Sequence, residues 1–343
     1  MLSPNVVPDF TRLRVAVVGD LIADRYLFAR PTRISREAPV LVMRHDHEVI
    51  GAGGAANVAR NLWALGAETF LIGAVGRNAD GRDLLRLLEQ EQIDVGGVVT
   101  VPEWTTPTKT RILGAERGRT PHQVLRIDQE PDAPLEPKVT GAIADRVRAL
   151  AGSVDALLVS DYGYGLIDEA VAEAALALQA AGTMVVLDPR ERIDHFRGVT
   201  GLTPNLAELA RLVGEPEESV TSPADVTRAA AKVMERADPR WLLVTLGNRG
   251  MVLYAPDLSD GVAIAASGSD QVIDVSGAGD TAAAAFTLGI AAGVDGPRAM
   301  RLANAASGVV VMESGTAVCT LSKLRSALPL SPQPARAVRT AHP

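Results

Sequence analysis

Short apolar runs that end in glycine alternate along this chain with segments of helical periodicity, and this alternation restricts the possible folds most strongly. Residues 14–19 form a β-branched apolar run, and apolar side chains recur at helical spacing over residues 57–65. The same two patterns return at residues 69–75 and 81–92. Strands that are apolar on both faces are buried in parallel sheets that helices cover on either side. The sequence therefore predicts an α/β fold with a doubly wound, mostly parallel sheet.

The rest of the chain continues this pattern with two interruptions. We expect further strands at residues 156–160, 184–187 and 242–246, helices at 168–181 and 224–236, and a buried helix over the apolar run 282–292. Two segments, at about residues 24–50 and 95–128, lack helical periodicity and alternate like strands, so they predict a small β-sheet lid. We expect residues 1–328 to form a single domain. Residues 329–343 are rich in Pro, Ala and Arg, which predicts a disordered tail.

Charge and cysteine content exclude several classes of protein. The 34 Lys and Arg residues against 41 Asp and Glu residues give a net charge of −7, and no basic run is interleaved with aromatics. Nucleic acid is therefore not an expected partner. A lone cysteine, Cys319, rules out an internal disulfide and a cysteine-rich zinc site. The N-terminus has no signal-peptide pattern, and the longest weakly polar run, residues 281–294, is too short to span a bilayer. We expect a soluble, cytoplasmic protein that does not bind membranes.

The most informative motif is Gly277-Ala278-Gly279-Asp280, which comes directly before the apolar helix. Glycines at a helix start let consecutive backbone N–H groups converge on one point, where the helix dipole adds positive potential. The motif therefore predicts an anion at this turn. Asp280 has two interpretations: it caps the helix, or it accepts a proton from a hydroxyl while the turn holds a phosphoryl group.

A second glycine cluster, Gly51-Ala-Gly53-Gly54-Ala-Ala-Asn57, precedes the first helix. It matches the letters of a dinucleotide-binding fingerprint, so an NAD-binding oxidoreductase is one interpretation. The segment before it belongs to the irregular lid stretch, which argues against that interpretation. The glycines can instead admit a polyhydroxylated ligand, with Asn57 as donor and acceptor, or serve only a tight turn.

Two carboxylates, Asp20 and Asp24, follow the first strand. Loops at the carboxyl ends of parallel strands hold ligands in α/β sheets, so these residues suit sugar hydroxyls, although solvated loop charge is an equal alternative. The chain contains no Gly-Lys pair, which excludes a P-loop kinase, and no G-x-S-x-G elbow of a hydrolase. Its five histidines do not form a metal-binding pattern.

Taken together, the two glycine motifs resemble those of the ribokinase/PfkB-type carbohydrate kinases over about residues 14–327. Within that family, further strings are similar to the D-glycero-D-manno-heptose 7-phosphate kinases, which phosphorylate O1 of a heptose 7-phosphate with ATP and Mg²⁺. These strings are Val18-Gly-Asp20-Leu-Ile-Ala-Asp24-Arg25-Tyr26, Arg33-Ile-Ser-Arg-Glu37-Ala-Pro39-Val40, and Thr108-Lys109-Thr-Arg111 with Arg126-Ile-Asp128. The resemblance implies a ribokinase-like fold with the lid described above.

The resemblance also implies a role for individual residues. Asp280 is the general base, and the N–H groups of Gly277, Ala278 and Gly279 form the anion hole. The residues that face the sugar are Asp20, Asp24, Gly53, Gly54 and Asn57. The lid cations near the substrate phosphate are Lys109, Arg111 and Arg126. The Asn-x-x-Glu motif that serves Mg²⁺ and phosphate is Asn205 and Glu208, and the nucleotide is held at Thr245, Gly247, Gly250 and Asn304. Asp274 and Ser276 match positions that bind a monovalent cation in some relatives, and K⁺ is the cation that the resemblance implies.

Two positions depart from the heptose kinase pattern. Tyr164 replaces a lysine of an Asp-Tyr-x-Lys-Gly string, and Arg190 replaces the lysine of Asp-Pro-Lys. Arginine keeps the charge of a lysine with a different geometry. Many bacterial relatives carry a further nucleotidyltransferase domain with an His-x-Gly-His string that is absent from this sequence, so we expect a kinase domain only.

The expected activity is therefore transfer of the γ-phosphoryl group of ATP to a phosphorylated sugar. Other acceptors within the family, an NAD(P)-binding oxidoreductase and a non-catalytic sugar-phosphate sensor are the alternatives. A small sheet with one apolar face favours association, so we expect a homodimer through the lid.

Overall fold

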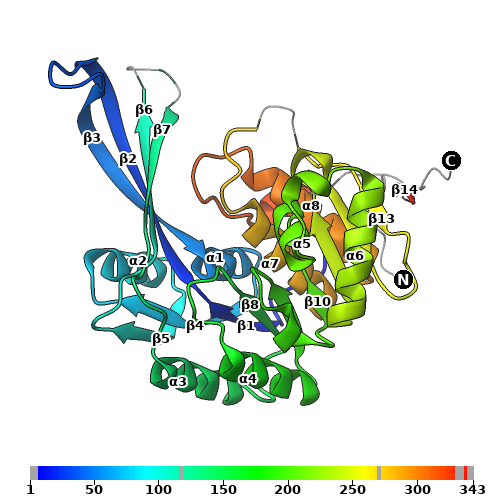
Figure 1. Cartoon of the computed structure of the whole chain (residues 1–343). Coiled ribbons are helices and arrows are strands. Elements are labelled where there is room, and N and C mark those ends of the chain that lie inside the picture. The colour runs from blue at the N-terminus through cyan, green and yellow to red at the C-terminus, as the bar shows by residue number, and fades with distance from the viewer. Residues whose placement is uncertain (1–6, 116–118, 120, 269–271, 329–335, 338–343) are drawn as a thin grey trace.

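A ten-stranded sheet forms the centre of the molecule (Figure 1). The computed structural model describes residues 7–115, 119, 121–268, 272–328 and 336–337. In spatial order the strands are β14 (Arg336–Ala337), β13 (Val262–Ile264), β12 (Met251–Tyr254), β11 (Trp241–Thr245), β10 (Gly201–Leu202), β9 (Met184–Asp188), β8 (Ala156–Ser160), β1 (Arg14–Gly19), β4 (Glu68–Gly76) and β5 (Asp94–Val101). All neighbours from β11 to β5 are parallel, and β12, β13 and β14 continue the sheet as antiparallel strands.

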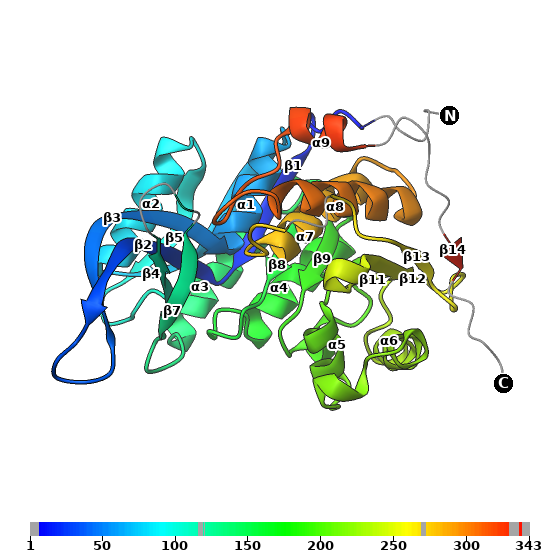
Figure 2. The same cartoon turned by 90° about the horizontal axis from the view of Figure 1, so that it is seen from above.

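Helices cover both faces of this sheet, as the view from above in Figure 2 shows. One face packs against α1 (Ala55–Ala64), α2 (Ala79–Gln90), α7 (Ala278–Ala291), α8 (Gly296–Val310) and α9 (Leu321–Ala327). The other packs against α3 (Pro137–Arg148), α4 (Glu169–Ala180), α5 (Leu206–Leu212) and α6 (Pro223–Ala237). Side chains of β1 alternate between the two cores: Val15 and Val17 join the first, and Ala16 and Val18 join the second. The predicted doubly wound α/β fold is confirmed, because a strand that is apolar at every position needs cover on both sides.

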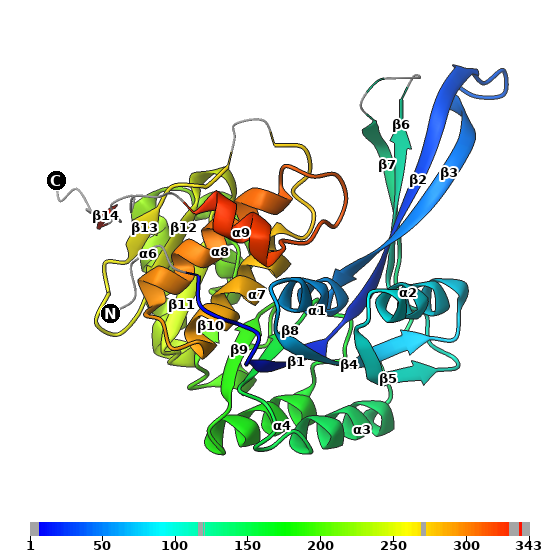
Figure 3. The ribbon, with the colours of Figure 1, turned by 180° about the vertical axis from the view of Figure 1, so that it is seen from behind.

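A second sheet of four strands stands away from the body beside α1 and α2 (Figures 1 and 3). Its order is β3 (Leu41–Gly54), β2 (Leu21–Ile34), β6 (Thr108–Gly114) and β7 (His122–Gln129). This sheet is the predicted lid. A single residue, Asp20, separates its strand β2 from the end of β1, so the lid continues directly from the carboxyl edge of the main sheet.

One lid boundary was wrong. Residues 95–101 were expected in the lid, yet they lie in β5, which pairs in parallel with β4 at the edge of the main sheet. The alternating pattern of this stretch has a different origin: Val98 packs against one core and Val99 against the other. A period of two does not distinguish a two-sided edge strand of the main sheet from a strand of a separate sheet.

The predicted tail falls largely outside the described residues. Within it the structure describes Arg336–Ala337, which pair antiparallel with β13. Short 3₁₀ turns at Ile193–Phe196, Glu217–Ser219 and Gly247–Arg249 complete the elements. Within the described part of the chain, no helix is both long enough and apolar enough to cross a membrane.

Candidate active site

Asp280 lies in the first turn of α7, where the carboxyl ends of the central parallel strands converge. Helix α7 begins at Ala278 rather than at residue 282, because Gly277 adopts a left-handed conformation (φ 78°) that turns the chain into the helix. Asp280 is only 3% exposed. It does not serve as the N-cap of α7, since that position belongs to Gly277 and no side chain caps the helix there. The capping interpretation of Asp280 is therefore wrong.

Each carboxylate oxygen of Asp280 accepts one hydrogen bond from a neutral side chain. Asn57 Nδ2 donates to Oδ2 at 2.8 Å, and the Tyr162 hydroxyl donates to Oδ1 at 2.7 Å. Burial raises the pKa of Asp280 to about 6, although the two hydrogen bonds favour the charged form. A carboxylate with a pKa close to neutrality is suited to taking up a proton at physiological pH.

A buried chain of polar side chains continues behind Asn57. Asn61 Nδ2 donates to the Asn57 carbonyl oxygen at 3.0 Å, and Asn61 Oδ1 accepts from Thr281 Oγ1 and from the Cys319 backbone N–H, both at 3.1 Å. The chain ties α1 to the start of α7 and to the segment before α9. Asn61 was not predicted from the sequence, since its helical spacing with Leu62 and Leu65 marks it only as part of a helix.

Tyr162 was also missed. It lies in the loop after β8, at the same edge of the sheet as Asp20, which follows β1. Its position directly after a predicted strand was the available signal, because ligand-facing loops follow the carboxyl ends of parallel strands.

The Gly51–Gly54 cluster forms the end of lid strand β3 rather than a strand-to-helix turn of the main sheet. A Cβ atom on Gly53 would lie 2.5 Å from Asp24 Oδ2, so glycine permits the close approach of β3 to β2. Gly54 has φ 58° and is the N-cap of α1. The dinucleotide-binding interpretation finds no support in this arrangement, because the cluster is not preceded by a strand of the parallel sheet.

The structure places Asp20 and Asp24 in different surroundings. The Asp20 carboxylate is buried and accepts backbone N–H groups of Tyr162 at 2.9 Å, Tyr164 at 3.2 Å and Leu166 at 3.4 Å. Burial, and the nearby charge of Asp161, raise the pKa of Asp20 to about 7. These contacts order the loop after β8, which is a different role from the expected sugar contact.

Asp24 and the three predicted lid cations lie side by side at the base of the lid. The strand register pairs Asp24 with Lys109, Lys109 with Asp128, and Arg111 with Arg126. Arg111 forms an ion pair with Asp24, and Arg126 makes a bidentate pair with Asp128 at 2.8 Å. The Lys109 ammonium lies over the Tyr162 ring, 5.2 Å from its centroid, and burial lowers its pKa. Lys109 therefore links the lid to the residues around Asp280.

Asn205 and Glu208 form a capping box at the start of α5. Asn205 Oδ1 accepts the Glu208 N–H, and Glu208 Oε2 accepts the Asn205 N–H, both at 2.9 Å. Burial raises the pKa of Glu208, and burial together with the charges of Glu208 and Asp280 raises that of Asp188. Arg190 Nη1 lies 4.0 Å from Glu208 Oε1. Acidic groups are thus concentrated here, and the positive charges of Arg190 and Arg211 act on Glu208.

Metal binding by side chains alone is not supported here. Among the described residues, no three His, Cys, Asp or Glu side chains lie close enough to hold a metal ion. The acidic oxygens of Glu208 and Asp188 fit Mg²⁺ in chemical type, since Mg²⁺ commonly keeps several waters and takes one or two carboxylates plus substrate phosphates.

The predicted nucleotide residues lie along the next strands of the sheet. Thr245 ends β11 and bridges to Asn205, so these two predicted positions are neighbours. Gly247 and Gly250 have positive φ values of 59° and 95° in the turn that follows. The Asn304 side chain on α8 donates to the Ala265 carbonyl at 2.9 Å and accepts the Ser267 N–H at 3.3 Å. Asn304 thus shapes the loop after β13 through both ends of its amide.

The start of α7 is partly open. A Cβ atom on Gly279 would meet no atom within 4 Å, whereas the Ala278 N–H donates to the Val275 carbonyl at 3.3 Å. Nearby, the Asp274 carboxylate accepts the N–H groups of Ser276 at 2.9 Å and Gly315 at 3.0 Å. Asp274 therefore holds the α7 turn against the loop before α9.

Both departures from the heptose kinase pattern border one pocket of about 460 Å³. Its lining includes Glu130, Tyr162, Gly163, Tyr164, Arg190 and Arg192. The Tyr164 hydroxyl lies 3.4 Å from Glu130 Oε1, at the end of lid strand β7. The pocket thus extends from the end of the lid to Tyr162, whose hydroxyl donates a hydrogen bond to Asp280.

Comparison with known proteins decides the family of this chain. The model of the pfkB family carbohydrate kinases matches residues 12–323. The chain belongs to the pfkB family of carbohydrate kinases. This pfkB family chain is 36% identical over 322 residues to the bifunctional protein HldE of Gluconacetobacter diazotrophicus. The alignment covers 93% of this chain and 64% of that protein. The chain is 38% identical over 325 residues to the bifunctional protein HldE of Methylococcus capsulatus, and that alignment covers 94% of this chain and 65% of that protein. The chain thus spans less than two thirds of the length of these relatives.

Solved structures of other kinases share the fold of this pfkB family chain. Phosphofructokinase-2 from Escherichia coli in complex with substrates and products superposes with a TM-score of 0.75 at 20% identity, over 92% of this chain and 98% of that one. Ribokinase of Arabidopsis thaliana, complexed with ribose and ATP, gives a TM-score of 0.69 at 22% identity, over 93% and 99%. The expected ribokinase-like architecture is confirmed.

Proposed function

We propose that this chain is an ATP-dependent sugar kinase that transfers the γ-phosphoryl group to a hydroxyl of a phosphorylated sugar, O1 of D-glycero-D-manno-heptose 7-phosphate. The observation that carries the proposal is the buried Asp280 at the partly open start of α7, held by Asn57 and Tyr162. The choice of acceptor is supported by the Arg33-Ile-Ser-Arg-Glu37-Ala-Pro39 string and by the identity with the HldE proteins.

In the proposed reaction Asp280 accepts the proton of the acceptor hydroxyl. The hydroxyl oxygen forms a bond to the γ-phosphorus of ATP, the bond from that phosphorus to the bridging oxygen breaks, and ADP leaves with the electron pair. Backbone N–H groups of Gly277 and Gly279, together with the dipole of α7, would stabilise the negative charge of the phosphoryl group. The Ala278 N–H would join them by leaving the Val275 carbonyl, to which it donates at 3.3 Å. Most of the rate enhancement in such a site comes from positioning and electrostatics.

We place ATP along the carboxyl edge of β10 to β12, with Thr245, Gly247, Gly250 and Asn304 around the nucleotide. Asn205 and Glu208 then lie toward its phosphates, and Glu208 would hold Mg²⁺ through water. When bound, Mg²⁺ would neutralise phosphate charge. Arg190, close to Glu208, adds a second positive charge there. We assign the reaction to the cytoplasm, where ATP is supplied.

For the sugar we retain Asp24, Gly53, Gly54 and Asn57, and we assign Asp20 to ordering the loop after β8. Lys109, Arg111 and Arg126 are the proposed contacts of the substrate phosphate. Each Arg has a carboxylate partner already, whereas Lys109 makes a cation–π contact instead, so Lys109 can turn to a phosphate at the smallest cost.

Two further assignments extend this proposal. Asp274 and Ser276 are the proposed residues of a monovalent cation site, since the Asp274 carboxylate keeps lone pairs beyond the two N–H groups it accepts. We also propose a homodimer through the lid, because Leu125 and Ile127 on β7 are each 52% exposed and lie on one face of the strand. Light scattering of wild type beside Ile127→Glu tests the dimer, and an unchanged mass in the variant would contradict it.

The test of function is an assay of ADP release with a panel of heptose, hexose and pentose phosphates, run on wild type and on Asp280→Asn. We expect the highest kcat/KM with heptose 7-phosphate and loss of turnover, by about 10³-fold or more, in the variant. Folding and nucleotide binding should persist, because asparagine retains the shape of aspartate. Turnover that survives in Asp280→Asn would rule out the mechanism, and preference for another phosphosugar would correct the acceptor.

A further inference from the structure

The hydroxyl of Tyr162 donates to the same carboxylate that we assign as general base. Its contact to Asp280 Oδ1 is 2.7 Å, and Asn57 holds the other oxygen at 2.8 Å. An ionised carboxylate offers about four lone-pair positions, so the two donors leave about one position free on each oxygen. The plane and tilt of the Asp280 carboxylate are thereby defined from two sides, by α1 and by the loop after β8.

Tyr162 is itself held in place independently of Asp280. Its backbone N–H donates to Asp20 Oδ2 at 2.9 Å, and Asp161, the residue before it, accepts the Gly163 N–H at 2.9 Å and the Arg190 N–H at 3.3 Å. The Lys109 ammonium lies over the ring, 5.2 Å from its centroid. The loop that carries Tyr162 is thus anchored by two buried carboxylates, and its hydroxyl is presented to Asp280 by a pre-ordered backbone.

A phenol that donates to a carboxylate favours the ionised form of the acid. Burial, together with the neighbouring Asp280 charge, raises the pKa of Tyr162 well above 10, so the phenol keeps its proton at every working pH. Burial acts on Asp280 in the opposite sense to this hydrogen bond and raises its pKa to about 6. Among the charged groups that face Asp280, Asp24 raises this pKa and Lys109 lowers it, and the charges of Asp280 and Asp188 repel each other. Without the phenol, the Asn57 hydrogen bond would be the one side-chain hydrogen bond left to oppose the effect of burial on the pKa of Asp280. The pKa would therefore rise, and Asp280 would keep its proton to a higher pH.

We propose that Tyr162 is the positioning residue of the general base: its hydroxyl orients the Asp280 carboxylate and keeps it ionised to receive the proton of the acceptor hydroxyl. This inference rests on the proposed kinase function. Tyr162 forms no bond to the transferred group in this proposal and acts through Asp280 alone.

The experiment compares Tyr162→Phe with wild type through the pH dependence of kcat/KM, between about pH 5 and 9. We expect the acidic limb of Tyr162→Phe to move upward by about 1 pH unit and kcat at pH 7 to fall about 10-fold, because a hydrogen bond to a charged group is lost. The KM for ATP should stay the same. The matched control is Tyr254→Phe, which removes a buried phenol that pairs with Thr227 Oγ1 at 3.1 Å, away from Asp280. Its pH profile should coincide with that of wild type.

Several results would overturn the inference. An acidic limb that stays in place in Tyr162→Phe, with only the KM for sugar altered, would mean that the hydroxyl merely occupies space beside the acid. An equal shift in Tyr254→Phe would trace the effect to the whole fold. Should Tyr162→Phe not fold, 3-fluorotyrosine at position 162 keeps the shape and is a stronger donor, so the limb should move downward, and an unmoved limb would contradict the proposal. Failure of the proposed function looks different: wild type would show no kinase activity, or Asp280→Asn would keep it.

Discussion

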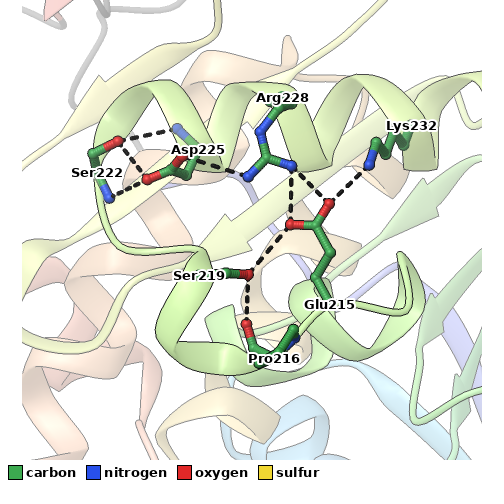
Figure 4. A network of polar contacts seen from close by, with 7 residues as sticks. All are labelled: Glu215, Pro216, Ser219, Ser222, Asp225, Arg228 and Lys232. Carbon is green, nitrogen blue, oxygen red and sulfur yellow. Dashed lines mark hydrogen bonds and ion pairs between the residues drawn. The ribbon is translucent and has the colours of Figure 1, made fainter.

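Asp280 at the start of α7 accepts hydrogen bonds from two side chains and Glu215, between α5 and α6, accepts them from three, yet the pKa values of the two acids move in opposite directions. The donors to Asp280 are neutral, and burial raises its pKa to about 6. Two of the donors to Glu215 are cations at the surface: Arg228 Nη1 lies 2.6 Å and Lys232 Nζ 2.8 Å from Oε1, and the third donor is the Ser219 hydroxyl, 3.3 Å from Oε2 (Figure 4). Hydrogen bonds from Arg228 and then Lys232 lower the pKa of Glu215 to about 2.

The two regions therefore support different kinds of chemistry. A surface acid among cations is fully ionised at neutral pH and stays so, which suits a structural link between α5 and α6. A buried acid among neutral donors has a pKa near neutrality, which suits proton transfer. Because burial disfavours its charged form, ionisation of this acid lowers the stability of the folded state. The ionised form of Asp280 that the proposed function requires therefore lowers the stability of the folded protein, a cost that the surface network does not carry.

The largest expected effect is on the stability of Asp280→Asn. The folded-state pKa of Asp280 lies above its unfolded value of 3.8, so the folded protein binds this proton more tightly, and the free energy of unfolding falls as pH rises from about 4 to 6. Removing the charge should raise the stability of the variant above that of wild type by up to about 3 kcal/mol at pH 7, and by little at pH 4. Urea unfolding at the two pH values measures the difference. An equal difference at both would contradict the assigned ionisation.

The next prediction compares Lys109, whose ammonium lies over the Tyr162 ring near Asp280, with Lys232, which pairs with Glu215. Lys109→Met should lower kcat/KM for a phosphorylated sugar by about 10- to 100-fold, because a charge-assisted contact to phosphate is lost. Lys232→Met, in the surface network, should leave kcat/KM as in wild type. The measurement is steady-state kinetics with heptose 7-phosphate. If both variants lose activity equally, the lid base is not the phosphate site and the contrast between the regions fails.

The smallest effect is expected for Glu215→Gln. The folded-state pKa of Glu215 is depressed, so the ion pairs stabilise the protein above the unfolded value of 4.5, and this contribution is lost as pH falls toward about 2. The variant should unfold at a slightly lower temperature than wild type at neutral pH and lose the difference in acid or in high salt. Glu217→Gln, exposed in the same segment, is the control. A salt-independent loss would point to packing instead of charge.

The secondary structure followed closely from periodicity. The strands at residues 14–19 and 156–160 were predicted at the bounds the structure has, because burial on both faces leaves a continuous apolar run. The helix of residues 224–236 differs from α6 by one residue at each end. The error at residues 95–101 arose because an edge strand with Val98 and Val99 on opposite faces has the same period as a lid strand.

The site was predicted in part. Asp280 and Asn57 were both named from glycine-rich motifs, and the structure brings them into contact although 223 positions separate them in the chain. Tyr162 and Asn61 were not named as site residues: the string that contains Tyr162 and the helical spacing of Asn61 do not show that their partners lie 118 and 220 positions away. Asp20 was named for the sugar, which stays a prediction, whereas its contacts to the backbone of the Tyr162 loop were not predicted.

Local periodicity and backbone freedom are enough to predict the layers of the fold, the glycine turns and the types of side chain at the carboxyl edge of the sheet. The pairing of side chains becomes visible only in the folded chain, where the acid of α7 is buried between an amide from α1 and a phenol from the loop after β8. Hydrogen bonding and burial depend on distance in space, which local patterns do not contain. Residues far apart in sequence therefore determine the pKa of one carboxylate.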